Sequence, residues 1–272
     1  MPWIDLTLLL AIGALAGLLA GLLGVGGGLV VVPALLWVLP HQGVAPADAL
    51  HVAVATSLAA ICLTALSSAH AHHRRGAVEW SWVIWLTPGL LLGAAGGARW
   101  VASWSSGFLA WFVAGFCVLA AWQLLRAPKT VVAGAVARQP DARWLLPGGV
   151  VIGMVSAAVG IGGGSLTVPL LHMRGAALRS AIATSAACGF PIALAGTLGY
   201  ASSAREVSGL SSWSLGLIDF RLALLLGALA VLLAPWGARL AHRLPVPRLK
   251  RGFALWLMAV AAFLAYKAAR GS

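Results

Sequence analysis

Charge is scarce in this sequence, and acidic residues are the scarcest of all. Only 9% of the 272 residues are charged and six acids stand against 18 lysines and arginines, while 61% of the residues are hydrophobic. This composition lies far from that of soluble domains. The apolar runs are continuous, unlike the alternating segments of about ten residues in a β-barrel. The sequence therefore predicts an all-α polytopic membrane protein.

Several chemistries lack the residues that they need. The three cysteines lie in apolar segments at unrelated spacing, which indicates neither a disulfide framework nor a metal site. The glycine-rich runs lack the Lys-Ser/Thr end of a P-loop and fail the dinucleotide spacing. No nucleophile and base stand together as in an enzyme. We expect no enzyme activity, no cofactor, no metal and no nucleic-acid partner, and the basic residues are expected to set membrane orientation.

Carboxylates are also missing from the centres of the apolar segments. The six acids lie at or beyond segment ends, at Asp5, Asp48, Glu79, Asp141, Glu206 and Asp219. Proton-driven transporters commonly carry a carboxylate near the midplane. An anion leaving a cell needs no such group, because the inside-negative potential supplies about 2.3 kcal/mol per charge per 100 mV.

The chain does contain about eight apolar segments. They cover approximately residues 6–39, 50–69, 80–98, 108–125, 145–171, 177–200, 222–238 and 253–266. The first and fifth segments share a motif at a constant offset, in which Gly17, Gly24, Gly26, Gly27, Gly28 and Pro33 match Gly153, Gly160, Gly162, Gly163, Gly164 and Pro169. Internal repeats are typical of transporters. The sequence predicts two homologous four-segment repeats, residues 1–125 and 144–272, joined by a polar linker at 126–143.

The length of the first segment requires a break. Its 34 residues would extend about 51 Å as a straight helix, whereas the hydrocarbon core is about 30 Å thick. If the first and fifth segments each enter the membrane and return, 13 of the 18 basic residues share one side and five lie opposite. The positive-inside rule favours that arrangement. We therefore expect an inverted repeat with both termini outside.

Glycine runs at membrane depth predict a break that lines a site. Glycine readily leaves the helical conformation, and the helix that restarts after the break presents free N–H groups at its positive end, which suits an anion. The predicted substrate-binding glycines are Gly26, Gly27, Gly28, Gly162, Gly163 and Gly164, and Gly24, Pro33, Gly160 and Pro169 are expected to shape the breaks. A close-packing surface is the alternative.

Hydroxyl and guanidinium groups recur at equivalent positions of both halves. The hydroxyls predicted to bind the substrate are those of the recurring pairs Thr56-Ser57 and Thr184-Ser185, together with Ser165, which occurs in the second half only. Hydroxyls inside helices also bond to their own backbone carbonyls, which is the alternative role. Arg99 and Arg239 are candidates for an anion vestibule, or for anchors that reach the membrane interface.

Together these motifs resemble the TauE/SafE sulfite exporter family of bacterial membrane proteins. The resemblance rests on GLLGVGGGLVVVPALL and AAVGIGGGSLTVPLLHM with VATSLAA and IATSAAC, and it covers nearly the whole chain. It implies export of sulfite or organosulfonates from the cytoplasm. The family's paired motifs fall on the glycines, prolines and Thr-Ser pairs named above.

The sequence thus predicts a secondary or facilitated transporter in the bacterial inner membrane, with a small anionic substrate and the lipid bilayer as partners. Alternating access would come from movement of one bundle against the other. A carrier of thiosulfate or another sulfur compound is the alternative within transport, and a membrane enzyme or an assembly factor is the alternative outside it. A homodimer is left open.

Overall fold

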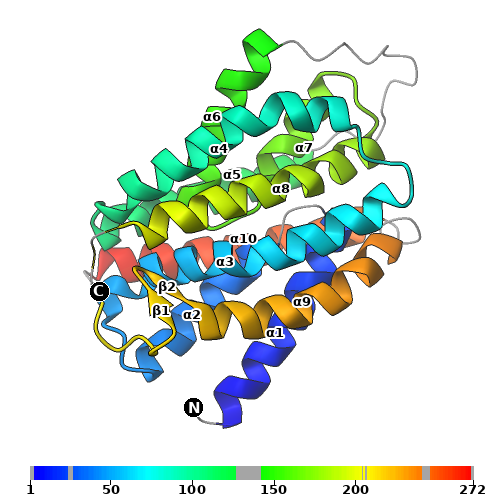
Figure 1. Ribbon diagram of the computed structural model, residues 1–272. Coiled ribbons are helices and arrows are strands. Elements are labelled where there is room, and N and C mark those ends of the chain that lie inside the picture. Colours follow the sequence, from blue (N-terminus) through cyan, green and yellow to red (C-terminus); the bar gives the residue numbers. More distant parts are fainter. Residues whose placement is uncertain are drawn as a thin grey trace.

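The fold is a bundle of helices with one very short hairpin (Figure 1). The structure is a computed structural model that describes residues 3–23, 27–126, 142–203, 205, 207–240 and 246–270. The first half contains α1 (Trp3–Leu23), α2 (Gly28–His41), α3 (Pro46–His73), α4 (Trp80–Ala102) and α5 (Ser106–Arg126). The second half contains α6 (Ala142–Val159), α7 (Gly164–Met173), α8 (Leu178–Ala201), β1 (Ser214–Leu215), β2 (Ile218–Asp219), α9 (Phe220–Leu240) and α10 (Val246–Ala269). β1 and β2 pair antiparallel.

Six of the described helices are long and apolar enough to cross a membrane. They are α3, α4, α5 and α8, with residues 220–237 of α9 and 251–269 of α10. Both segments that carry glycine runs are interrupted as predicted, so that α1 with α2 and α6 with α7 are pairs of shorter or broken helices. The count of eight segments therefore becomes six spanning helices and two broken segments. The predicted linker falls largely on residues 127–141, which lie outside the described residues.

The helices α3 and α8 form the centre of the bundle. In an 18-residue apolar stretch of each helix, 83% of the residues of α3 and 72% of those of α8 are buried, whereas 33% of those of α10 are buried. α9 packs on α3, α4 packs on α8, and α5 packs against α10. Large apolar side chains on α4, α5, α9 and α10 are exposed in this arrangement, as expected for helices that face lipid.

Glycines allow close packing at two equivalent helix pairs. On α4, Gly89 and Gly93 lie directly against Leu146 and Val150 of α6. In the same way Gly17 of α1 lies against Ala230 of α9. Such contacts between backbones need residues without a side chain, which is the usual way in which membrane helices associate. Each broken segment is therefore held by a helix of the other half, as α6 is by α4 and α1 is by α9.

The broken segments are helical hairpins. Gly13 and Gly17 of α1 contact Leu226 and Ala230 of α9, so these helices run parallel. Helix α9 begins beside Thr56, in the first half of α3. α2 leads directly into α3 through residues 42–45 and so returns to the side from which α1 came. Both chain termini lie toward the lower left in Figure 1, on the side of the β hairpin.

Candidate functional site

The two breaks have almost the same backbone geometry. Gly27 precedes α2 with φ 75° and ψ −8°, and Gly163 precedes α7 with φ 76° and ψ −7°. This left-handed conformation is readily available only to glycine. The carbonyl oxygens of Gly27 and Gly163 each accept the first two hydrogen bonds of the helix that follows. Of the predicted glycines, Gly24 and Gly26 lie outside the described residues.

The breaks meet each other in the interior. A Cβ atom on Gly28 would lie 2.0 Å from the carbonyl oxygen of Gly160, so the two backbones are in direct contact. The hydroxyl of Ser57, on α3, donates a 2.9 Å hydrogen bond to the same carbonyl oxygen. Gly160 itself has φ 75°. The structure therefore brings together three of the predicted residues, from both halves, at one buried point.

The predicted threonines lie where the two halves join. The Thr56 hydroxyl oxygen accepts a 3.0 Å hydrogen bond from the Asp219 N–H at the start of α9. In the equivalent place the Thr184 hydroxyl oxygen accepts a 3.0 Å bond from the Glu79 N–H at the start of α4. Each threonine thus positions the first turn of a helix from the other half. Ser185, next to Thr184, is fully buried.

One carboxylate is more deeply buried than its position at a segment end suggested. Asp219 is 1% exposed, and its Oδ1 accepts hydrogen bonds from the N–H groups of Arg221 and Leu222. It therefore caps α9, where a negative charge is stabilised by the free N–H groups of the first turn. Its equivalent Glu79 accepts a hydrogen bond from the Ser180 hydroxyl.

The second break contains hydroxyls that have no partner. The side-chain oxygens of Ser156, Ser165 and Thr167 are buried and make no hydrogen bond. A Cβ atom on Gly163 would lie 3.4 Å from both Ser156 Oγ and Thr167 Oγ1, so these two oxygens converge on the break. Ser165 was predicted from the motif, whereas Ser156 and Thr167 were not. A comparison of the two halves at the constant offset could have found them, because the equivalent residues are Ala20 and Val31.

The two candidate vestibule arginines lie exposed at helix ends. Arg99, in the last turn of α4, and Arg239, in the last turn of α9, are both exposed. The Arg239 guanidinium lies 5.0 Å from the ring centroid of Trp236 on the preceding turn. The structure does not bring these arginines together with the glycine breaks.

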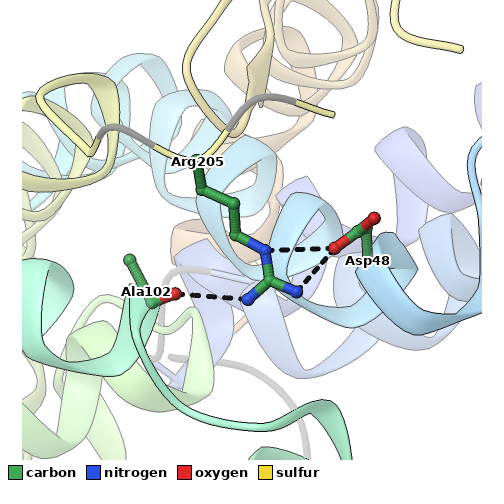
Figure 2. A network of polar contacts seen from close by, with 3 residues as sticks. All are labelled: Asp48, Ala102 and Arg205. Atoms are coloured by element: carbon green, nitrogen blue, oxygen red, sulfur yellow. Dashed lines mark hydrogen bonds and ion pairs between the residues drawn. The ribbon is translucent and has the colours of Figure 1, made fainter. Parts of the chain in front are cut away.

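A network of polar contacts joins three elements at the end of the bundle where α3 begins. The Arg205 guanidinium donates to Asp48 Oδ1 from Nε and Nη2, at 3.1 and 2.6 Å, and from Nη1 to the Ala102 carbonyl at 3.2 Å (Figure 2). Asp48 lies in the first turn of α3, Ala102 ends α4, and Arg205 follows α8. The network therefore connects both central helices to α4 at one end of the molecule.

These features define a polytopic helical membrane protein of the transporter class, with two broken helices that meet in its interior. A family model described as "Sulfite exporter TauE/SafE" matches residues 9–264. The chain belongs to this family.

Relatives of known description agree with that class. A "Probable membrane transporter protein" of Haemophilus influenzae is 35% identical over 254 residues, which cover 93% of this chain and 96% of that protein. A protein of the same description from Methanocaldococcus jannaschii is 28% identical over 191 residues, or 66% of each chain. The probable membrane transporter protein YdhB of Bacillus subtilis is 26% identical over 197 residues, or 71% of this chain and 78% of that protein. No solved structure matches.

The descriptions of the family and of these relatives are those of membrane transporters and not of enzymes. The chain is therefore a multi-pass membrane transporter, with the lipid bilayer and a small substrate as its partners.

Proposed function

We propose that this transporter exports sulfite or a related organosulfonate from the cytoplasm across the bacterial inner membrane. The observation that carries the proposal is the contact between the two glycine breaks, where Gly28 meets Gly160 inside the bundle. Non-helical backbone at membrane depth is tolerated where it is buried in protein or lines a cavity. Helices α2 and α7 both begin there, and their free N–H groups favour an anion.

The two halves of the proposed transporter form an inverted repeat. Five helices follow in the same order in each half, and the contact of α4 with α6 has its counterpart in the contact of α9 with α1. The end of α8 lies beside the start of α3 through Arg205 and Asp48, which makes these equivalent helices antiparallel. The repeats are proposed to be residues 1–125 and 144–272.

The orientation of the repeat sets the direction of transport. With both broken segments as hairpins, 13 of the 18 basic residues fall on the side of the loop between α3 and α4, which includes Arg74 and Arg75. That side is cytoplasmic by the positive-inside rule. An anion on it is driven outward by the membrane potential, by about 2.3 kcal/mol per charge per 100 mV.

The substrate is proposed to bind between the breaks. The binding region comprises the glycine runs, with hydroxyls of α3, α7 and α8, at Gly26, Gly27, Gly28, Thr56, Ser57, Gly162, Gly163, Gly164, Ser165, Thr184 and Ser185. Arg99 and Arg239 lie exposed at the ends of equivalent helices, where they can attract anions toward either entrance. Alternating access would move one broken segment relative to the central helices α3 and α8.

Sulfite release from proteoliposomes tests this function. Vesicles containing the purified chain are loaded with sulfite, and efflux is measured at zero potential and at a potential that drives anions outward. We expect efflux above that of empty vesicles, rising with the potential. Vesicles loaded with methanesulfonate test the organosulfonate class in the same way. Wild-type protein that is folded and releases neither anion would contradict the proposal.

A further inference from the structure

The second glycine break contains buried hydroxyls that form no hydrogen bond within the protein. Ser156 Oγ and Thr167 Oγ1 belong to fully buried residues, and Ser165 Oγ is itself buried, yet none of the three has a hydrogen-bond partner. Buried polar groups are almost always paired, and an unpaired one requires an explanation. A ligand that binds in another state of the transport cycle is such an explanation.

Some other hydroxyls of the described helices, one buried and one half-buried, find partners in their own helix. Thr64 donates to the Ala60 carbonyl at 3.1 Å, and Thr87 donates to the Val83 carbonyl at 2.7 Å. This back-bonding to the residue four positions earlier is open to any serine or threonine inside a helix. Ser156 and Thr167 do not use it, so their hydroxyls remain available in the described state.

Two of the three unpaired oxygens converge on one point of the backbone. Ser156 comes from the end of α6 and Thr167 from the first turn of α7, and each oxygen lies 3.4 Å from the position of a Cβ atom on Gly163. The two oxygens are therefore no more than twice that distance apart. The Ile192 Cδ1 atom of α8 lies 2.4 Å from the same Cβ position, so the Ile192 side chain fills this point in the described state and must move before an anion can enter.

The chemistry of this point suits a small oxyanion. The hydroxyls of Ser156 and Thr167 lie next to Gly163, and that of Ser165 belongs to the first turn of α7; each can donate one hydrogen bond. The first N–H groups of α7, at Gly164 and Ser165, have no acceptor within their own helix, and they lie at its positive end. All of these donors are neutral, so they would hold an anion without the tight binding that an ion pair would impose on a carrier.

The first break lacks this chemistry. At the positions equivalent to Ser156, Ser165 and Thr167 the sequence has Ala20, Leu29 and Val31. The Leu29 carbonyl accepts a 3.3 Å hydrogen bond from the indole N–H of Trp256. The two breaks therefore share a backbone but not a set of donors.

We infer that the transporter has a single oxyanion subsite, formed in the second break by Ser156, Ser165, Thr167 and the first N–H groups of α7. This inference rests on the proposed function and narrows its site: of the wider binding region proposed above, only groups of the second break would contact the sulfite or sulfonate group directly. The first break then has a structural role: Gly28 packs against Gly160 and so helps to hold the second break in place.

Sulfite binding to purified full-length protein tests the inference. The melting temperature in detergent is followed as sodium sulfite replaces sodium chloride at constant ionic strength, which yields an apparent Kd. In the double variant S156A and T167V we expect sulfite to bind about 100-fold more weakly, or roughly tenfold for each lost hydroxyl. T167S keeps the hydroxyl and should bind sulfite as the wild type does. T64V, which removes a paired buried hydroxyl of α3, is the matched control and should also bind normally.

The melting temperature without sulfite is a second measurement, and it distinguishes a ligand-binding hydroxyl from one that stabilises the fold. Because the two hydroxyls are unpaired in the described state, their removal should leave the ligand-free melting temperature unchanged or raise it. A double variant that binds sulfite like the wild type, or that melts earlier without ligand, would overturn the assignment. If the double variant does not fold, S165A alone repeats the test at a less buried residue.

Transport separates this inference from the proposed function. If the wild type exports sulfite and the double variant exports it equally fast, the subsite is wrong and the function stands. If the folded wild type neither binds nor exports sulfite or methanesulfonate, the proposed function fails and the subsite fails with it.

Discussion

The two glycine breaks have nearly identical backbones and very different surroundings. Gly27 and Gly163 differ by 1° in both φ and ψ. The first-half equivalents of the second break's hydroxyl residues are Ala20, Leu29 and Val31, all buried and apolar, whereas the unpaired hydroxyls of Ser156 and Thr167 lie next to Gly163. An apolar groove of about 570 Å³ lies beside the first break and includes Val30 and Pro33. The comparison teaches that two breaks with the same backbone geometry can differ in the hydrogen-bond donors around them.

The largest effect is expected where the two breaks touch. In G28A the new Cβ atom would lie 2.0 Å from the Gly160 carbonyl oxygen, and backbone cannot move aside as a flexible side chain can. We expect destabilisation by more than about 4 kcal/mol and loss of the monodisperse peak in size-exclusion chromatography. G115A, on α5 with no atom within 4 Å of the new Cβ, should behave as the wild type. A well-folded G28A protein would mean that the breaks are not in contact.

A smaller effect is expected from the hydrogen bond that spans the contact. S57A leaves the Gly160 carbonyl oxygen without its 2.9 Å donor in a fully buried position. The loss should be about 2 to 3 kcal/mol, seen as a lower melting temperature without ligand. This is the opposite direction to the change expected for S156A and T167V. Equal shifts for Ser57 and Ser156 would remove the distinction between a paired hydroxyl and an unpaired one.

The two halves should respond alike at their threonines. T56V removes the acceptor of the Asp219 N–H, and T184V removes the acceptor of the Glu79 N–H. Each variant should lower stability by about 1 to 2 kcal/mol, as judged by thermal melting in detergent. Similar losses would support equivalent roles at the two half-to-half contacts. A loss confined to one threonine would show that the halves differ here as they do at the breaks.

The smallest effect is expected at the ion pair of Figure 2. The side chains of Arg205 and Asp48 are 30% and 23% exposed, so water and salt weaken their attraction. R205Q should lower stability by less than about 1 kcal/mol, with a difference from the wild type that shrinks as salt is added. The residue equivalent to Asp48 in the second half is Ala176, so this contact belongs to one end only. A salt-independent loss of several kcal/mol would contradict this account.

Hydropathy and the repeated motif predicted much of the fold because both depend on local properties. A long run of apolar residues forms a membrane helix whatever the rest of the chain does, and three adjacent glycines weaken a helix wherever they occur. The membrane class, the interrupted first and fifth segments and the family were therefore accessible from the sequence. The segment count was less accessible, since the two broken segments are hairpins and do not add spanning helices of their own.

The candidate site was predicted only in part. The glycine motifs pointed to the breaks, and Ser165 belongs to one of them. Ser156 and Thr167 were missed because the prediction used residues that the two halves share, whereas the first half has Ala20 and Val31 at these positions. Asp219 likewise lies at a segment end in the sequence, and its burial follows from the packing of α9 on α3.

The sequence by itself determined that this chain inserts in a membrane, that its helices break at two glycine runs, and that it belongs to a transporter family. The tertiary structure alone decided which groups find partners. Ser57 meets Gly160 across 103 residues, and Arg205 meets Asp48 across 157. Such contacts depend on how helices of the two halves pack together, whereas the bilayer selects helices one segment at a time. The same packing left Ser156 and Thr167 unpaired beside Gly163, where a substrate oxyanion is proposed to bind.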